Sequence, residues 1–562
     1  MVADVRIDNR AELASALGLA PAAAGALSDA GLLMRAWQRW REGALQRTVG
    51  DYALAVWDGE RLTLARDFPG QRPLVYWRGE DQLAFASMPH GLLALDELSA
   101  HADPLSLERF ARFARPVGNS TYLRGILTVA PGETIAFMPG AAKRTMHWAP
   151  PSAPLLLPSD EDYVDAVGET LDRAVAARLR GGEGGVACHL SAGLDSSAVT
   201  AATARLHTAA QPIAAITVVP KGEFRSDSRD RLTDERKLAA ATAALYDSIE
   251  HVVVERANRS PVHHFETWLD LFLRPVPEVI NQDWYTGANE EVQRRGISVL
   301  LHGQAGNFTF SHTGSEVLAE TLGQARLAHW RTESRLRVAA GSTWRRVLGQ
   351  SLAPFLPRPL WLLSQTVRGR PARIEDYALV RSGSARIGAF GARRHGEVDY
   401  SVQPYAESRR RRAEALASID FGTINKGLLA GWGVDARDPT ADRRFIDLTL
   451  AIPATQFNRG GAARSLARRV LAARVPPDVL VEPRRGYQSA DWLSYLSQYR
   501  GDLEAEAERQ RQSGAAGFLD LERMRELLLH WPASWDAPVA QRLHRGALMT
   551  ALAAGHFARH AR

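Results

Sequence analysis

The residues best suited to chemistry lie in one short segment, Ser191-Ala192-Gly193-Leu194-Asp195-Ser196. Residues 186–190 before it are typical of a buried strand, and residues 197–206 after it of a helix. Unpaired N–H groups at a helix start favour a bound anion, and the serines at both ends of the segment add hydroxyl donors. Gly193 lets the backbone approach a phosphate closely. We therefore predict a phosphate-binding loop; the alternative is an ordinary β–α turn in which a serine caps the helix.

Asp195 places an acid where a phosphate is expected. A bridging cation would reconcile the two negative groups, so we assign Asp195 to Mg²⁺. The loop is not a Walker loop, because no Gly-Lys-Ser/Thr follows it.

Strand and helix signals alternate around this loop. Strand-like segments at 186–190, 213–219, 251–254 and 298–301 are separated by long helical stretches, which predicts a parallel sheet wrapped by helices. Ser159 is expected to cap a helix whose apolar residues recur at helical spacing: Val164, Val167, Leu171, Val175 and Leu179. From about 315 to 560 we find no convincing strand and expect helices. The arginine run 409–412 is interpreted as a solvated helix face, or as a docking patch for an acidic partner.

A proline-rich stretch, residues 149–158 (APPSAPLLLP), can continue neither a helix nor a central strand. We interpret it as a linker. Before it, short β-prone runs at 52–57, 61–65, 82–86 and 133–137 predict a strand-rich domain with flanking helices.

The composition sets outer limits. A chain of 562 residues argues for two to four domains. A net charge of +6 is a weak argument for nucleic acid, and we expect no such partner. The single cysteine, Cys188, forbids an internal disulfide and fits a reducing, cytoplasmic setting. We see no export segment and expect no membrane insertion.

The loop resembles the pyrophosphate loop (Ser-x-Gly-x-Asp-Ser) of the ATP pyrophosphatases, which cleave ATP between the α and β phosphates and adenylate a carboxylate or carbonyl. Other motifs narrow the family. Residues 50–58, 65–67 and 72–74 look like the N-terminal domain of asparagine synthetase, and 433–442 (GVDARDPTAD) resembles that family's Gly-x-Glu-x-Arg-x-Pro-Phe-Leu-Asp stretch.

This resemblance implies an α/β protein with ATP and Mg²⁺ as cofactors. Residues 1–148 would form a degenerate Ntn-hydrolase-like αββα domain of glutaminase type. Residues 159–562 would form a PP-loop (adenine nucleotide α-hydrolase-like) parallel-sheet domain with a large helical C-terminal part, joined by the linker 149–158. The implied ATP site consists of Leu190, Ser191, Gly193, Leu194, Asp195, Ser196, Val218 and Gly303.

The first departure from asparagine synthetase concerns its ammonia source. That family attacks glutamine with a cysteine at the processed N-terminus, where this chain has Val2. Cys188 lies in the strand before the phosphate loop, where a small buried hydrophobe is the ordinary interpretation. The family's Asn-Gly-Glu segment has no counterpart in residues 1–45. We therefore expect no glutaminase, so the attacking amine must arrive on another molecule or on the substrate itself.

Further departures lie in the synthetase half. In His302-Gly303-Gln304-Ala305-Gly306-Asn307, the family's acidic residues are replaced by Gln304 and Asn307, which we include among the catalytic candidates with Asp195 and Arg485. The alternative is a β–α turn locally capped by Asn307. Arg485 matches the position of the family's lysine before a glycine and would neutralise developing charge; the alternatives are that Arg484 faces the phosphates, or that this is a basic surface turn.

These features look most like the lasso peptide macrolactam synthetases. By that resemblance the enzyme adenylates an Asp or Glu side chain of a leader-free core peptide, and the peptide's own α-amine closes an isopeptide ring. A leader-recognition protein and a leader protease are the implied partners. The rivals are a β-lactam synthetase, for which we expect a compact pocket where a peptide cyclase needs an open groove, a PP-loop RNA-modifying enzyme, and a non-catalytic scaffold.

Overall fold

The structure is a computed structural model of the chain. It describes residues 1–561 except 183, 210, 223, 225–230, 358, 361–362, 364–366, 368–376, 382–407 and 514–516.

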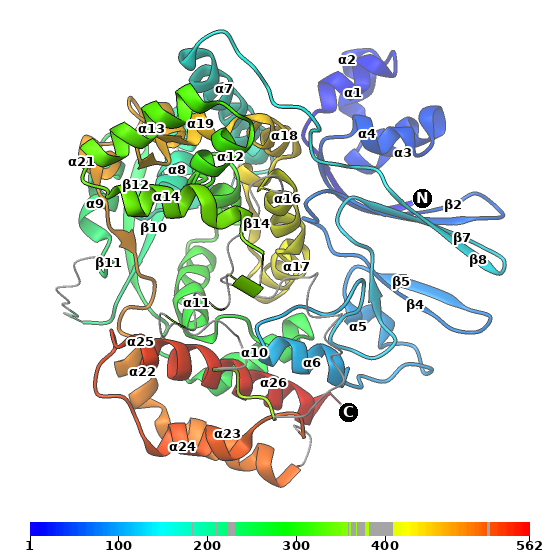
Figure 1. Cartoon of the computed structure of the whole chain (residues 1–562). Helices are drawn as coiled ribbons and strands as arrows, with labels where there is room; N and C mark the ends of the chain where they lie inside the picture. The colour runs from blue at the N-terminus through cyan, green and yellow to red at the C-terminus, as the bar shows by residue number, and fades with distance from the viewer. Residues whose placement is uncertain are drawn as a thin grey trace.

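The N-terminal part is built from two antiparallel sheets between layers of helices (Figure 1). The first sheet has the order β1 (Val2–Ile7), β2 (Gly50–Trp57), β3 (Leu62–Arg66), β7 (Glu133–Met138), β8 (Ala141–Met146), and the second β5 (Leu83–Ala86), β4 (Val75–Arg78), β6 (Leu127–Thr128). The helices are α1 (Arg10–Ala16), α2 (Pro21–Ala26), α3 (Asp29–Trp40), α4 (Gly43–Arg47), α5 (Pro89–Leu92) and α6 (Pro104–Ala111). The predicted αββα arrangement is confirmed.

A five-stranded sheet forms the centre of the second part. Its order is β12 (Ile249–Glu255), β10 (Ile213–Val219), β9 (Val186–His189), β13 (Val299–Leu301), β14 (Asp435–Arg437), and every pairing is parallel, as predicted. The helices along it are α7 (Asp160–Leu179), α8 (Leu194–Leu206), α9 (Arg236–Ala243), α10 (Pro261–Phe272) and α11 (Val279–Arg294). Ser159 caps α7 through a capping box with Asp162, as its sequence predicts.

Residues 147–159 between the two parts form neither helix nor strand. The division into domains at 148 and 159 stays a prediction.

The C-terminal part is mostly helical, as expected. Its helices are α12 (Val317–Gly323), α13 (Leu327–Ala339), α14 (Trp344–Leu352), α16 (Ser408–Ser418), α17 (Phe421–Trp432), α18 (Arg443–Ala451), α19 (Ala454–Phe457), α20 (Ser465–Val470), α21 (Pro477–Val481), α22 (Trp492–Gln498), α23 (Arg500–Ser513), α24 (Leu521–Leu529), α25 (Pro538–Ala540) and α26 (Met549–His560).

Two expectations for this region are wrong. Strand β14 lies within it, because three residues that pair only with β13 at a sheet edge leave no periodic signal. The arginine run is not uniformly solvated either. Arg412 is buried and donates to the carbonyls of Phe308, Thr309 and Thr449, so it ties α16 to the site region.

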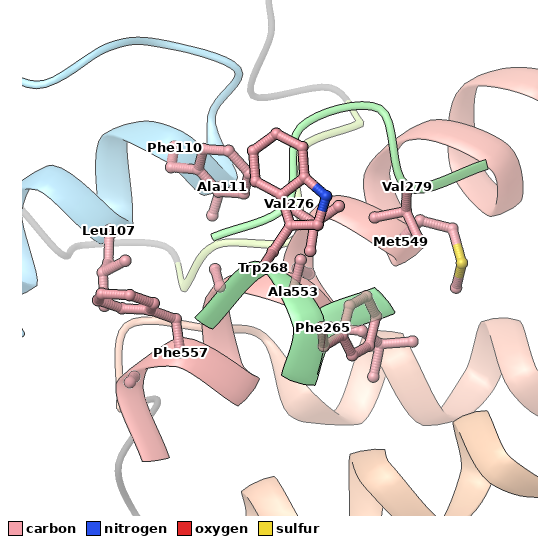
Figure 2. Packing of buried hydrophobic residues seen from close by; sticks show 14 of the residues in the cluster. Leu107, Phe110, Ala111, Phe265, Trp268, Val276, Val279, Met549, Ala553 and Phe557 are labelled. Atoms are coloured by element: carbon pink, nitrogen blue, oxygen red, sulfur yellow. The ribbon is translucent and has the colours of Figure 1, made fainter. Parts of the chain in front are cut away.

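A hydrophobic cluster joins the two ends of the chain. Figure 2 shows Leu107 and Phe110 of α6, Trp268 of α10 and Phe557 of α26 converging in it. A backbone bond from Ala102 N–H to the Ala561 carbonyl lies beside it. Since burial of each large apolar side chain contributes roughly 1.5–3 kcal/mol, this cluster holds the N-terminal domain firmly on the C-terminal helices.

A buried charge network makes the second connection. Arg178 of α7 is paired with Asp442 at 2.8 Å, Asp8 at 3.1 Å and Asp51 at 3.7 Å. The surrounding carboxylates raise the pKa of Arg178 although burial opposes this, and Arg178 in turn lowers the pKa of Asp442. One guanidinium therefore bridges the N-terminal sheet and the Asp442 end of the GVDARDPTAD segment.

We predict that Arg178→Ala lowers the free energy of unfolding by about 3 kcal/mol, because three buried carboxylates lose the cation that they share. Arg6 and Arg444 remain paired with these carboxylates, which keeps the loss near the lower end for a broken buried ion pair. Urea denaturation followed by circular dichroism measures this. Arg173→Ala, an exposed change on the same helix, should stay within about 0.5 kcal/mol of the parent. Equal stability of the two variants would contradict the assigned role of Arg178.

Candidate functional site

The phosphate loop is shorter than its sequence suggests. Helix α8 begins at Leu194 with Gly193 as its N-cap, so the prediction of a loop through Ser196 is wrong in its second half. Asp195 and Ser196 lie in the first helical turn, because N-terminal positions tolerate acidic and hydroxyl side chains. The hydroxyls of Ser191 and Ser196 are 2.7 Å apart, and Gly193 N–H donates to the Ser191 hydroxyl at 3.0 Å. The two serines therefore present their hydroxyls together at the helix start.

Asp195 is enclosed by the turn that follows β13. A Cβ atom at Gly306 would lie 2.1 Å from Asp195 Oδ1, and one at Gly303 would lie 2.9 Å from the Asp195 carbonyl oxygen. Both positions therefore require glycine. Burial raises the pKa of Asp195 to about 6, and Ser311 and Arg464 only partly offset this.

The surroundings of Asp195 suit a cation. Its Oδ1 atom is buried and has no hydrogen-bond partner among the described residues. Mg²⁺ is commonly held by one or two carboxylates together with phosphate oxygens. Asp195 beside the serine hydroxyls fits this pattern and would hold the ion. The described residues contain no cluster of three His, Cys, Asp or Glu side chains arranged for a metal.

The residues 303–308 are fixed by the GVDARDPTAD segment. The Asp438 carboxylate accepts the Ala305 N–H at 2.7 Å and lies 3.7 Å from His302 Nδ1. The two catalytic candidates of this turn, Gln304 and Asn307, are exposed and line a large cavity next to the phosphate loop. Asn307 Oδ1 accepts a hydrogen bond from Arg464 at 2.9 Å, so it acts as more than a local cap.

The two arginines before Gly486 differ in their contacts. Arg484 is held in a two-pronged ion pair with Glu482, both bonds being 2.8 Å. The Arg485 guanidinium is exposed, lines the cavity and has no hydrogen-bond or ion-pair partner in the described part of the chain. Burial lowers the pKa of Arg464, and the nearby Arg485 acts in the same direction. The geometry thus favours Arg485 as the cation that faces the loop.

The remaining predicted ATP residues lie at the carboxyl edge of the sheet. Leu190 and Leu194 are buried with only small surfaces toward the cavity, while Val218 is half-buried and lines it. His189 is also on this edge, and its Nε2 atom is buried without a hydrogen-bond partner among the residues that the structure describes. Cys188 is fully buried, and burial raises its pKa to about 12, which confirms it as a core residue rather than a nucleophile.

Sequence reasoning missed two residues of the site. Glu235 accepts the Ala192 N–H at 3.0 Å, and a Cβ at Gly486 would lie 2.5 Å from its Oε1 atom, so one carboxylate sits between the phosphate loop and the strand β17 (Arg485–Gly486). Burial raises the pKa of Glu235 to about 7. Arg464 has a left-handed backbone, φ 61°. Neither stands in a recognisable motif, and Arg464 is one of several arginines in its segment.

The phosphate loop and the polar residues around it line one cavity of about 3260 Å³: Ser191, Gly193, Asp195, Ser196, Glu235, Gln304, Asn307, Arg464 and Arg485. It extends from the phosphate loop to residues of the N-terminal domain, among them Phe110, Phe113 and Arg115. Arginines outnumber acidic residues along its wall. The arrangement can hold a polyanion and a cation at one end while leaving room for a large second molecule.

No helix in the part of the chain that the structure describes is long and apolar enough to cross a membrane.

Comparison with known proteins agrees with this architecture. Residues 166–556 match the asparagine synthase family, and residues 1–148 match a glutamine amidotransferase domain. Asparagine synthetase (glutamine-hydrolyzing) 3 of Bacillus subtilis is 29% identical over 180 residues, 32% of this chain and 29% of that protein. Carboxyethyl-arginine beta-lactam-synthase of Streptomyces clavuligerus is 32% identical over 201 residues, 35% and 36% of the two chains. The matches thus span about a third of these relatives. On the family match over most of its length, the chain belongs to the asparagine synthase family.

Proposed function

We propose that this protein is an ATP-dependent amide-forming ligase that closes a macrolactam on a ribosomal core peptide. Asparagine synthase family members are ATP-dependent amide-forming ligases that produce AMP and pyrophosphate. The reaction would join a side-chain carboxylate to AMP with release of pyrophosphate. The peptide's N-terminal amine would then displace AMP, losing a proton as the amide forms.

The size of the cavity is the observation that favours a peptide as the substrate. Pockets for small ligands occupy roughly 300–1,000 Å³. The cavity here, at about 3260 Å³, is several times larger and reaches from the phosphate loop to the N-terminal domain. A free amino acid and ammonia would leave most of it unfilled, whereas a folded-back peptide would occupy it.

Different residues of the chain would have different roles in this reaction. Ser191, Gly193 and Ser196 would bind phosphate oxygens, and Asp195 would hold Mg²⁺, which supplies charge neutralisation when bound. Arg464 and Arg485 line the same cavity close to each other, and they would neutralise the charge of the departing pyrophosphate. Holding the amine and the activated carboxylate together would supply much of the rate.

The source of the amine follows from the missing thiol. The segment that matches a glutamine amidotransferase domain contains no cysteine, and the only thiol of the sequence is in the core of β9. Ammonia from glutamine is therefore not expected. A leader-recognition protein and a leader protease remain part of this proposal as the partners that deliver the core peptide.

A second candidate is amide formation within a small molecule, since one relative is a beta-lactam synthase. Its cyclisation within one substrate would also need no ammonia. The cavity volume favours the peptide. A PP-loop RNA-modifying enzyme is less consistent with the glutamine amidotransferase-like domain at residues 1–148.

We predict that a core peptide with a free N-terminal amine and an acidic residue in its ring segment yields AMP and pyrophosphate and loses one water. Nucleotide chromatography and peptide mass spectrometry measure both products. ADP as the main product would contradict adenylation. AMP formation with a small β-amino acid but with no peptide would favour the second candidate. Added glutamine should neither be hydrolysed nor increase the rate.

We predict that Arg485→Ala lowers kcat about 10²- to 10³-fold with little change in KM for ATP, because a fixed cation near developing charge acts on the transition state. Arg484→Ala is the matched control and should have a small effect, since Arg484 is already paired with Glu482. Partial rescue by Arg485→Lys would support a role based on charge. If Arg484→Ala carries the whole loss, the assignment is reversed.

We predict that Asp195→Asn abolishes turnover while stabilising the fold. The pKa of Asp195 rises from 3.8 to about 6 on folding, so its ionised form opposes folding by about 3 kcal/mol above pH 6. In ligand-free protein the gain from asparagine should be largest near pH 8 and shrink as the pH falls below 6. Denaturant titrations at several pH values test this. Asp165→Asn, an exposed change on α7, should show no such dependence.

A further inference from the structure

A second group of charges lines the cavity where the N-terminal domain meets the synthetase part. Arg115 lies in the loop after α6, Arg274 follows α10, and Asp420 is the N-cap of α17. All three line the cavity. None belongs to the phosphate loop, the 303–308 turn or β17, so this group is separate from the adenylation site.

The group carries more positive than negative charge. Arg274 forms an ion pair with Asp420, whose other oxygen lies 4.0 Å from Arg66. Arg66 already donates to backbone carbonyls at 72, 129 and 70. These two guanidiniums lower the pKa of Asp420, although burial alone would raise it. Asp420 is thus already shared between two cations.

Arg115 is the one cation of this group that is not paired with Asp420. Its guanidinium is half-buried and forms no hydrogen bond or ion pair with any described residue. Burial lowers its pKa to about 10, and the nearby Arg274 acts in the same direction, against Tyr122 and Asp420. Arg274 lies beside it on the same wall, donates to Asp420, and has a buried Nε–H without a partner among the described residues. The donors still open to a ligand at this place on the cavity wall are therefore those of Arg115, with a second positive charge next to them.

The backbone beside both arginines is strained. Phe113 has φ 58° and Leu273 has φ 45°, left-handed conformations that residues other than glycine seldom adopt. Such conformations persist only where the surrounding structure imposes them, and they cluster at binding sites. Phe113 and Leu273 themselves line the cavity.

The pair lies against the hydrophobic cluster that joins the two ends of the chain. Phe110 of α6 and Trp268 of α10 belong to the hydrophobic cluster of Figure 2 and also line the cavity. Arg274 stacks over Trp268 and Tyr122, at 5.9 and 5.4 Å from the ring centroids. Guanidiniums held this way are well placed for a planar anion, since less freedom is lost when it binds.

We propose that Arg115, together with Arg274, binds a carboxylate of the substrate that is not the one activated by ATP. The proposal rests on the peptide ligase function above. The carboxylate would belong to the peptide's C-terminus or to a second acidic side chain, which share one chemistry. The N-terminal domain would then be retained because it supplies one half of the substrate site, and substrates with a carboxylate at this distance would be preferred.

The test uses three short, neutral, N-terminally BODIPY-labelled peptides of one sequence. The first has a free C-terminal carboxylate, the second a C-terminal amide, and the third an amide plus one Gln→Glu change. Fluorescence anisotropy without ATP gives their affinities. We expect the free carboxylate, the Glu side chain or both to bind about tenfold or more tightly than the neutral peptide, as charged hydrogen bonds allow. Which peptide gains identifies the source.

Arg115→Ala should remove this preference and Arg115→Lys should restore part of it. Arg124→Ala, which removes the same charge from an exposed position of the same domain outside the cavity, should keep it. Equal binding of all three peptides by the parent, no measurable binding of any, or a preference that survives Arg115→Ala would overturn the proposal.

Failure of this inference can be distinguished from failure of the proposed function. Cyclisation that proceeds in Arg115→Ala with unchanged KM for the peptide would leave the ligase function standing and remove the carboxylate site. The opposite result is a carboxylate preference that depends on Arg115 in a protein that forms no AMP with any peptide. It would support the carboxylate site and contradict the ligase function.

Discussion

The site depends on the packing of Asp195 against two glycines of the turn after β13. Strands β9 and β13 are neighbours in the sheet, so the loops that leave them meet at its carboxyl edge. With a Cβ atom at Gly306 only 2.1 Å from Oδ1, no other residue could bring the two loops this close. The same closeness removes water from Asp195 and raises its pKa. A buried carboxylate with an oxygen that has no partner among the described residues is thus a consequence of how the two loops pack, and under the proposed function this oxygen would hold Mg²⁺.

The GVDARDPTAD segment connects this packed turn to the N-terminal sheet. Asp438 holds Ala305 and therefore the glycine turn, and Asp442 holds Arg178 and therefore the N-terminal sheet. Because only three residues separate them, the distance between the turn and the N-terminal domain is set by one short stretch of backbone. The N-terminal domain is tied to the synthetase half through this network, since its Asp8 and Asp51 share Arg178 with Asp442.

Much of the fold could be predicted because its signals are local. The buried strands 186–189 and 213–219, the capped helix after Ser159 and the order of motifs need only neighbouring residues to be recognised. Strand β8 was missed because all its side chains are exposed, and β14 because it has three residues. Glu235 and Arg464 were missed for a different reason. Their roles arise from contacts with Ala192 and Asn307, which are 43 and 157 positions away, and no local pattern encodes such distances.

Arginine shows most clearly where sequence reasoning stops. The chain has far more arginine than lysine, so arginine by itself indicates nothing about function. The structure separates these residues by what their donors already bind. Arg66 and Arg412 donate to backbone carbonyls, and Arg178 and Arg484 are paired with carboxylates. Arg485 and Arg115 line the cavity without a partner among the described residues. The two differ in their exposure. The exposed Arg485 keeps its donors in solvent, whereas the half-buried Arg115 carries a cost that an anionic ligand would remove, since burial disfavours an uncompensated charge. Under the proposed function the two arginines would therefore face different anionic groups, the phosphates at Arg485 and a substrate carboxylate at Arg115.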